Sequence, residues 1–224
     1  MKNDSQNHSR WQLKTKTLTI LQTPLIMGIV NATPDSFSDG GNYRAPEDAI
    51  AHGLRLAAEG ADIIDIGGES TRPYSKPVSA EQEIERVVRV VQGIAAKTDV
   101  PISIDTNKAV VATAAIQAGA EIINDVTGLT GDPDMLKVAA DSGVGVCAMH
   151  MQGTPATMQD NPQYENVVQE VLEYLKQRKA CLLEAGIPLE KICLDPGIGF
   201  GKRTSTTLSY WLAARHFLSS VVRF

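Results

Sequence analysis

The sequence of 224 residues is poor in the features that mark several large classes of protein. Asp and Glu (26) outnumber Lys and Arg (21), so the net charge is -5 and no basic surface for nucleic acid is expected. Aromatic residues make up only 5% of the chain, and no apolar run approaches the ~20 residues that a membrane-spanning helix needs. The chain is nevertheless 43% hydrophobic, which is enough for a sizeable buried core.

Cysteine is also scarce and shows no metal-binding pattern. The three cysteines, Cys147, Cys181 and Cys193, are widely spaced in apolar segments, without a CxxC motif or a Cys/His spacing. We therefore expect buried free thiols in a reducing cytoplasm. The polar N-terminal stretch contains no apolar signal-peptide core, which also favours a cytoplasmic location. We interpret residues 1–13 as a flexible polar tail and residues 14–224 as one domain.

Six short apolar runs rich in β-branched residues alternate along the chain with segments of helical periodicity. The runs span residues 25–30, 62–66, 101–104, 121–123, 144–149 and 191–194. This alternation is typical of parallel strands that are buried on both faces. We expect an α/β fold, a TIM-type (β/α)₈ barrel with only six βα units and a short N-terminal β-rich extension. A doubly wound open sheet is the alternative, although the glycine fingerprint expected after its first strand is missing.

Polar side chains follow five of these six apolar runs, at or just after the end of the predicted strand. They are Asn31, the neighbours Thr71 and Arg72, Asp105, Asn124 and Asp195. Because the carboxyl ends of parallel strands converge on one face, where barrel enzymes build their sites, we expect these side chains to share an active site. A single Asp after a strand is more often a helix cap or an ion-pair partner, but polar ends on five of six apolar strands favour a site.

Other catalytic motifs are excluded by their residues. The segment from Gly197 to Lys202 resembles a phosphate-binding loop, but Pro196 and Arg203 stand where a Walker motif needs Gly and then Ser or Thr. No Gly-x-Ser-x-Gly elbow or HExxH motif occurs in the sequence. His150 follows a strand without a carboxylate or nucleophile in register, so we interpret it as structural.

The stretch of residues 27–41 carries the most specific signal. A buried strand ends there on Asn31 and opens into a loop of turn-forming residues, Thr-Pro-Asp-Ser-Phe-Ser-Asp-Gly-Gly. This stretch resembles the first signature of the dihydropteroate synthase family, and the resemblance continues in order to about residue 202. The further segments that match the family are residues 67–73, 103–106, 123–126, 149–153 and 195–202.

The resemblance implies a transferase that joins 6-hydroxymethyl-7,8-dihydropterin pyrophosphate to p-aminobenzoate, with Mg²⁺, and releases 7,8-dihydropteroate and pyrophosphate. The family is the target of sulfonamides and is commonly homodimeric. By position, Asn31 is expected to bind Mg²⁺ and the pyrophosphate, and Thr71 and Arg72 to contact the diphosphate. Asp105 and Arg72 are the residues expected to be catalytic. The residues expected to bind the pterin or to shape the aminobenzoate pocket are Asp105, Asn124, Asp195, Met149, Phe37 and Pro73.

The residue types suit that reaction. A pterin edge offers an N–H beside an amino group, which matches a carboxylate such as Asp195, and Asn124 can donate and accept at another ring edge. A metal ion and Arg72 can neutralise the leaving pyrophosphate, and Asp105 favours the positive charge of a pterin-stabilised carbocation. The arylamine then attacks directly, so no nucleophilic residue is required.

Two alternatives to a complete synthase stay open. A pterin-binding methyltransferase of the related barrel type would share the fold, although the loops at residues 33–37 and 70–73 argue against it. A truncated, inactive synthase fragment is the other, because the family continues past Lys202 through two strands with Ser-Arg-Lys and Arg-x-His segments that are absent here. We expect residues 207–222 to be helical, the first and sixth strands of the sheet to be edges, and residues 1–224 to show little or no synthase activity.

Overall fold

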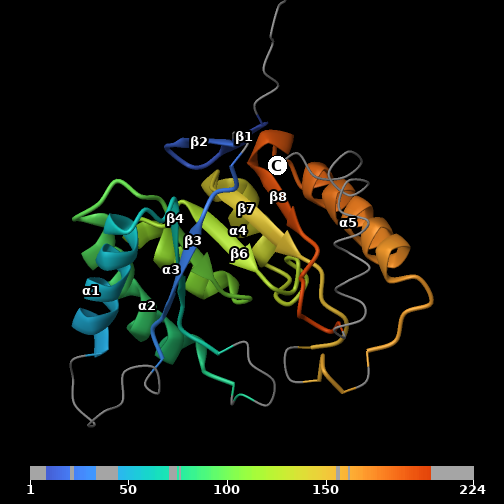
Figure 1. Cartoon of the computed structure of the whole chain (residues 1–224), viewed down its shortest axis with the longest axis horizontal. Coiled ribbons are helices and arrows are strands. Elements are labelled where there is room, and N and C mark those ends of the chain that lie inside the picture. The colour runs from blue at the N-terminus through green and yellow to red at the C-terminus, as the bar shows by residue number, and fades with distance from the viewer. Residues whose placement is uncertain are drawn as a thin grey trace, which may run out of the picture.

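The computed structural model describes residues 9–20, 23–33, 45–70, 75, 77–154, 157–160 and 162–202. Its main feature is a parallel sheet whose strands lie side by side in the order of the chain (Figure 1). The strands of this sheet are β3 (Met27–Asn31), β4 (Ile63–Gly67), β5 (Ile102–Asp105), β6 (Ile122–Asp125), β7 (Gly145–Met149) and β8 (Ile192–Asp195). A separate antiparallel hairpin is formed by β1 (Ser9–Gln12) and β2 (Thr17–Ile20).

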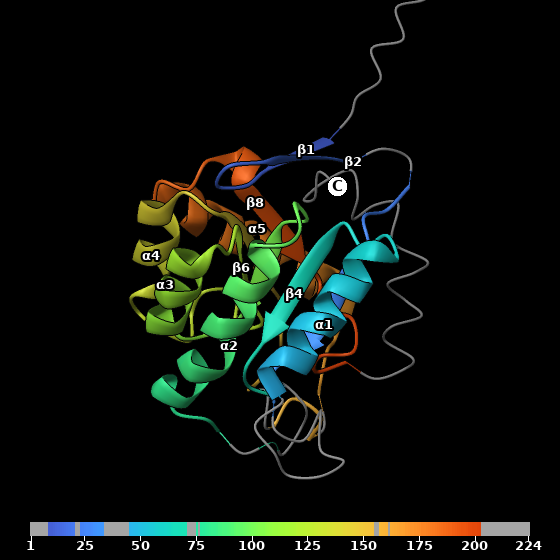
Figure 2. The same ribbon diagram turned by 90° about the vertical axis from the view of Figure 1, so that its left-hand side faces the viewer.

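Helices connect successive strands and cover the outside of the curved sheet, as Figures 1 and 2 show. They are α1 (Ala45–Ala58), α2 (Ala80–Ala95), α3 (Ala109–Ala118), α4 (Met135–Ser142) and α5 (Val167–Glu184), with a short 3₁₀ turn η2 (Leu189–Lys191) before β8. The predicted alternation of six parallel strands with helices is confirmed. Among the described residues β3 and β8 are the outer strands of the sheet, as expected for the first and sixth strands. The predicted helix at 207–222 lies outside the described residues.

Local sequence signals set the ends of the helices. Ser79 is the N-cap of α2, and it forms a capping box in which Gln82 N donates to its hydroxyl and its own N–H donates to the Gln82 side chain, both at 3.3 Å. Gly143 ends α4 in the left-handed conformation, with a φ of 67°, which glycine adopts without a steric penalty.

One face of each strand packs against the helices and forms the larger core. In β3 to β5, Val30, Ile64 and Ile104 are each 0% exposed, and they belong to one cluster with the apolar stripes of α2, α3 and α5. Alternate residues of the same strands must therefore face the concave side of the sheet, because successive side chains point to opposite faces. The residues at the carboxyl ends of the strands thus include a set aimed into the concave side.

The hairpin β1–β2 closes the opposite end of the sheet, where the strands begin. Leu13 is fully buried and Trp11 nearly so, and the Trp11 indole N–H donates to the carbonyl of Lys191 at 3.0 Å. Both pack with Ile63 and Ile122 in a second cluster on the concave side. A side chain at Gly145 would lie 2.8 Å from Leu13, so the hairpin approaches β7 closely.

The N-terminal boundary differs from the sequence prediction. We expected residues 1–13 to form a flexible tail, but Ser9–Gln12 form a strand and pair with Thr17–Ile20. The prediction failed there because Trp11 and Leu13 are apolar residues isolated among polar ones, so no run of strand-forming residues is visible. Their burial against the sheet, rather than local propensity, orders this segment.

The three cysteines are free, but they lie in different environments. Cys147 on β7 and Cys193 on β8 are register partners that face the concave side, and both are at least partly buried. The expectation of a buried thiol is wrong for Cys181, which is exposed because it lies beside, and not on, the buried stripe of α5 formed by Val171, Leu175 and Leu182. None of the helices in the described ranges is both long and apolar enough to cross a membrane.

Candidate active site

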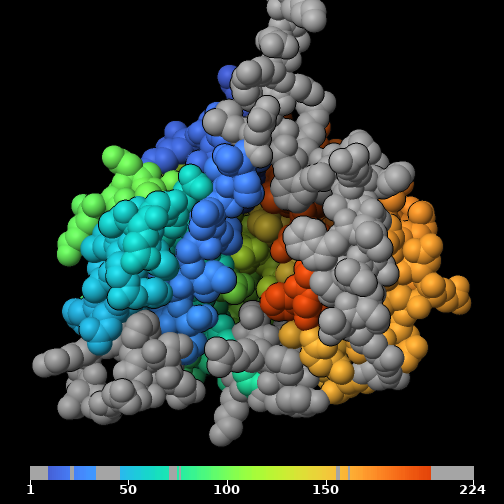
Figure 3. All heavy atoms as spheres, viewed as in Figure 1, coloured from blue at the N-terminus to red at the C-terminus, as the bar shows by residue number. Residues whose placement is uncertain are grey.

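The carboxyl ends of the six strands bring the predicted polar residues into one row. Asn31 of β3 is in register with Gly67 of β4, Gly67 with Asp105 of β5, and Asp105 with Asn124 of β6. At the other edge of the sheet, Met149 of β7 is in register with Asp195 of β8. In the space-filling view, atoms of the middle strands are visible in a hollow between β3 (blue) and β8 (red) (Figure 3). The row therefore borders the concave side of the sheet.

Asp105 lies in the most acidic part of the row. Burial raises the pKa of its carboxyl well above the usual value, and the negative charges of Asp65 and Asp125 raise it further. Its pocket has a volume of about 160 Å³ and is also lined by Glu69 and Glu83. A group that carries positive charge or N–H donors would be stabilised beside Asp105, since the described residues provide acidic neighbours on several sides.

Asn124 is held from below by Asp65. The Asn124 Nδ2 donates to the Asp65 Oδ2 at 3.2 Å, although β5 lies between the two strands that carry these residues. Asp65 is only 5% exposed, and burial raises the pKa of its carboxyl. The bond therefore crosses the concave side of the sheet one layer beneath the row of strand ends.

Asp195 presents a carboxyl group at the end of β8. Its Oδ1 accepts a hydrogen bond from the N–H of Gly197 at 2.7 Å, and because each carboxylate oxygen has two lone pairs, Oδ2 and the second lone pair of Oδ1 can accept from a ligand. Burial raises the pKa of Asp195, while the N–H of Gly197 and the charge of Lys202 act in the opposite direction. Met149, its register partner, is 4% exposed and forms an apolar wall beside it.

Lys202 is a buried cation that fixes the loop after β8. Its Nζ lies 3.0 Å from His150 Nδ1 and donates to the carbonyls of His150, Gly197 and Phe200. Burial lowers the pKa of Lys202 to about 8, and burial together with the nearby Lys202 charge lowers the pKa of His150 to about 4. His150 thus has the structural position that the sequence indicated, between Lys202 and an edge-on contact with Tyr174 at 4.8 Å.

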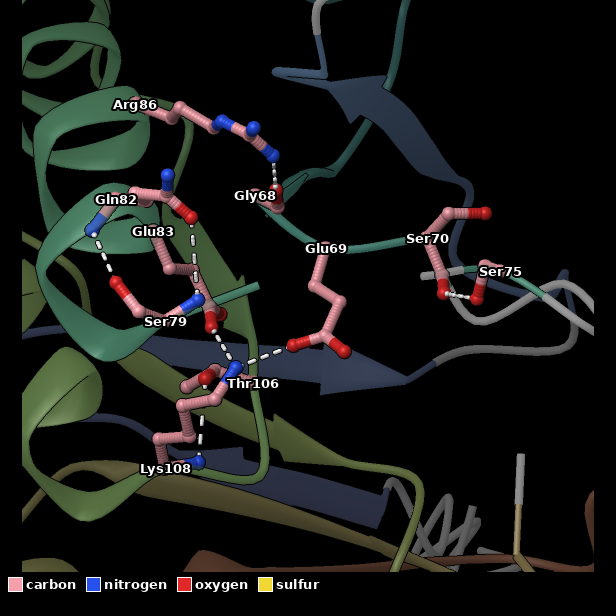
Figure 4. Close-up of polar contacts among 10 residues, drawn as sticks. All are labelled: Gly68, Glu69, Ser70, Ser75, Ser79, Gln82, Glu83, Arg86, Thr106 and Lys108. Carbon is pink, nitrogen blue, oxygen red and sulfur yellow. Dashed lines mark hydrogen bonds and ion pairs between the residues drawn. The ribbon is translucent and has the colours of Figure 1, made fainter. Parts of the chain in front are cut away.

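A second polar cluster supports the loop after β4 (Figure 4). Lys108, from the loop after β5, forms ion pairs with Glu69 in the β4–α2 loop and with Glu83 on α2. Burial alone disfavours its charge, but the hydrogen bonds to the two carboxylates raise the pKa of Lys108. Arg86 donates to the carbonyl of Gly68 at 2.9 Å. The segment that leads to Thr71 and Arg72 is therefore anchored to two neighbouring elements.

The structure places at one end of the sheet all of the predicted site residues that it describes. Asn31, Asp105, Asn124, Met149 and Asp195 all lie at the carboxyl ends of the strands. The predicted residues that lie outside the described ranges are Phe37, Thr71, Arg72 and Pro73.

Sequence reasoning missed two residues of the site. Asp65 is a carboxylate in the middle of an otherwise apolar strand, which is the signal that could have revealed it. Lys108 had no such signal, because its two partners are distant in sequence. No group of three or more His, Cys, Asp or Glu side chains that could hold a metal occurs among the described residues.

The chain is similar to known proteins over most of its length. A sequence model of the family described as "Pterin binding enzyme" matches residues 27–217. The dihydropteroate synthase of Escherichia coli K12 is 49% identical over 195 residues, which cover 87% of this chain and 68% of that protein. The family model ends later than the motif resemblance, which we placed at about residue 202.

Solved structures agree with the fold. A dihydropteroate synthase of Xanthomonas albilineans with 4-aminobenzoic acid superposes with a TM-score of 0.88 and 45% identity, over 96% of this chain and 76% of that one. A Burkholderia cenocepacia dihydropteroate synthase complexed with 7,8-dihydropteroate gives a TM-score of 0.81 and 42% identity, over 92% and 70% of the two chains.

The sheet, the row of strand-end side chains and the family match together define a pterin-binding enzyme of the TIM-barrel type. The class can be narrowed further, because the curated relatives that are 47–49% identical to this chain are all named dihydropteroate synthase. The chain belongs to the dihydropteroate synthase family.

Proposed function

We propose that this site binds a dihydropterin pyrophosphate and condenses it with p-aminobenzoate, so that 7,8-dihydropteroate and pyrophosphate are formed. The observation that carries the proposal is the row of hydrogen-bond acceptors, Asp105, Asn124 and Asp195, on the carboxyl ends of parallel strands. The related structures that contain 4-aminobenzoic acid and 7,8-dihydropteroate support the same pair of substrates.

Asp195 suits the pyrimidine edge of a pterin. That edge carries an N–H beside an amino group, and a carboxylate is the side chain that accepts from both. One oxygen of Asp195 is already held by the N–H of Gly197, which fixes the orientation of the carboxyl group before a ligand arrives. Met149 beside it offers an apolar surface to the flat ring.

The acidic surroundings of Asp105 suit the bond-breaking step. The C–O bond between the pterin methylene and the diphosphate breaks, and the electron pair leaves with pyrophosphate. The cation that remains is delocalised over the pterin, and Asp105 with its acidic neighbours stabilises it. The amine of p-aminobenzoate then forms the C–N bond and loses a proton to water. We assign to Arg72 and Thr71 the role of stabilising the negative charge on the leaving diphosphate.

Asn31 is the residue that we propose to hold Mg²⁺. Its side chain is exposed at the end of β3, and Gly67, its register neighbour, has no side chain to crowd it. Amide oxygen is a ligand that Mg²⁺ accepts, and protein sites commonly give it few side chains and leave the rest to phosphate and water. When bound, the ion would neutralise charge on the diphosphate.

The test is to incubate the protein with dihydropterin pyrophosphate and p-aminobenzoate and to measure both products. Formation of dihydropteroate and pyrophosphate in equal amounts is the result expected of a longer version that carries the two further strands of the family, whereas residues 1–224 alone are expected to show little or no turnover. Turnover that persists after a metal chelator is added would argue against the role of Asn31. Transfer of a methyl group from a methylated folate, without pyrophosphate release, would favour a methyltransferase instead.

We also propose that sulfonamides inhibit the protein, that it acts in the cytoplasm and that it forms a homodimer. These proposals extend the family resemblance. Competition between a sulfonamide and p-aminobenzoate in the product assay, and sedimentation analysis of the purified chain, would test the first and the last. An inhibition that p-aminobenzoate does not relieve would contradict the shared pocket.

A further inference from the structure

We infer that Asp65 is a positioning residue that holds the side-chain amide of Asn124 with its oxygen toward the ligand, an inference that rests on the proposed function. Asp65 itself lies beneath the row of strand ends and does not reach it. Its effect on binding passes through Asn124, which belongs to the row.

The contact between Asp65 and Asn124 joins two strands that are not neighbours in the sheet. Asp65 is on β4 and Asn124 on β6, and β5 runs between them. The hydrogen bond of 3.2 Å therefore spans the concave side over Ser103, the β5 residue that is in register with Asp65. Such a contact does not follow from strand pairing. It requires both side chains to be aimed at the same interior point.

The chemistry of the pair fixes which way the amide points. A carboxylate has only acceptors, so it selects the Nδ2 group of Asn124 and excludes the alternative orientation, in which two oxygens would face each other. Asp65 is 5% exposed, and the hydroxyl of Ser103 and the amide of Asn124 are the two side-chain donors that lower the pKa of its carboxyl. Because a buried carboxylate is costly without hydrogen-bond donors, the hydrogen bond from Asn124 Nδ2 to Asp65 is favoured.

The orientation decides what the row offers to a ligand. With Nδ2 turned toward Asp65, the Asn124 oxygen joins the carboxyl groups of Asp105 and Asp195 as an acceptor at the strand ends. A ligand that presents several N–H donors from a flat ring matches that set. Without Asp65 the Asn124 amide could rotate by half a turn. Its Nδ2 would then face an N–H donor of the ligand, and both donors would be left without an acceptor.

The experiment exchanges the two partners. We would measure by calorimetry the affinity for 6-hydroxymethylpterin of the full chain, of Asp65→Asn, of Asn124→Asp and of the double variant that combines them. Each single variant should bind at least about tenfold more weakly, because the pair then holds two amides or two carboxylates. The double variant keeps one amide–carboxylate pair and an acceptor oxygen at the strand end, so it should recover to within about threefold of the parent.

Asp141→Asn is the matched control. It makes the same carboxylate-to-amide change at an exposed ion pair with Lys137 on α4, so it should leave pterin affinity unchanged. Thermal unfolding of every variant separates stability from binding, and titrations are made where all are folded. Unchanged affinity of Asp65→Asn, or failure of the double variant to recover, would overturn the positioning role alone. A parent chain that binds no pterin would overturn both this role and the proposed function.

Discussion

At the residue scale, the site is built from ionisable side chains that are buried more deeply than their charge favours. Burial raises the pKa of Asp65, Asp105 and Asp195, and these three carboxyl groups lie on β4, β5 and β8. Perturbed groups of this kind concentrate where a protein handles charge. Asp105 and Asp195 border the space that we propose for the pterin, and Asp65 lies one layer beneath it. In the proposed function these carboxyl groups face the pterin ring and not the diphosphate, so the acidic net charge of the protein does not oppose binding of the substrate.

His150 provides a pH-dependent test at this scale. Its pKa is about 4 in the folded protein, below the ordinary value of 6.5, because burial and the charge of Lys202 disfavour protonation. The unfolded chain therefore binds a proton first as the pH falls, and the stability that depends on neutral His150 is present above pH 6.5 and lost between 6.5 and 4. That loss should reach about 3 kcal/mol in the free energy of unfolding.

The control for this pH dependence is His150→Asn. Its amide oxygen can replace Nδ1 as the acceptor of Lys202 but does not titrate. Chemical unfolding of both proteins between pH 7 and 4 should show a difference that grows as the pH falls. Parallel curves would contradict the assignment of this loss to His150.

Lys108→Met tests the cluster beside the β4–α2 loop. The Glu83 side chain is only 1% exposed, so the change leaves a buried carboxylate without its cation. We expect a loss of about 3 kcal/mol in the free energy of unfolding. Lys137→Met is the matched control, because Lys137 forms an exposed pair with Asp141, and it should change stability by less than about 0.5 kcal/mol. Equal effects of the two changes in urea unfolding would refute the structural role of Lys108.

At the scale of elements, the sequence was informative wherever a pattern was continuous. The six apolar runs predicted the six parallel strands. The pattern could not predict the hairpin, because Trp11 and Leu13 are buried by contact with residues that are distant in the sequence. The same holds for Asp65, whose partner Asn124 lies across a strand. Contacts of this kind depend on the register of the folded sheet.

Leu13→Ala measures what the hairpin contributes. Leu13 is 0% exposed and packs at the amino end of the sheet, so its truncation removes buried apolar surface and leaves a cavity. The expected loss is about 2–5 kcal/mol in the free energy of unfolding. Leu183→Ala on α5, where the side chain is 43% exposed, should cost much less by the same denaturation measurement. A similar small loss for Leu13 would mean that the hairpin is not part of the core.

At the scale of the whole molecule, the two faces of the sheet have different functions. The outer face packs on helices through aliphatic side chains, and that packing sets the strand order. The concave face is apolar near the hairpin and acidic near the carboxyl ends of the strands. This gradient was predictable in part, because polar residues follow apolar runs in the sequence. The ordering of the acidic layer beneath them was not, since it depends on contacts between non-adjacent strands.

In the proposed function, the carboxyl ends of these strands bind a pterin. The most direct measurement is calorimetric titration of the chain with 6-hydroxymethylpterin, repeated with Asp195→Asn. The substituted amide presents a donor toward the donors of the pterin edge, so we expect the variant to lose about 1–3 kcal/mol of binding free energy or more. Binding of p-aminobenzoate, which occupies a different part of the proposed site, should weaken much less. Equal pterin affinity of the two proteins would contradict pterin binding by Asp195 at the end of β8.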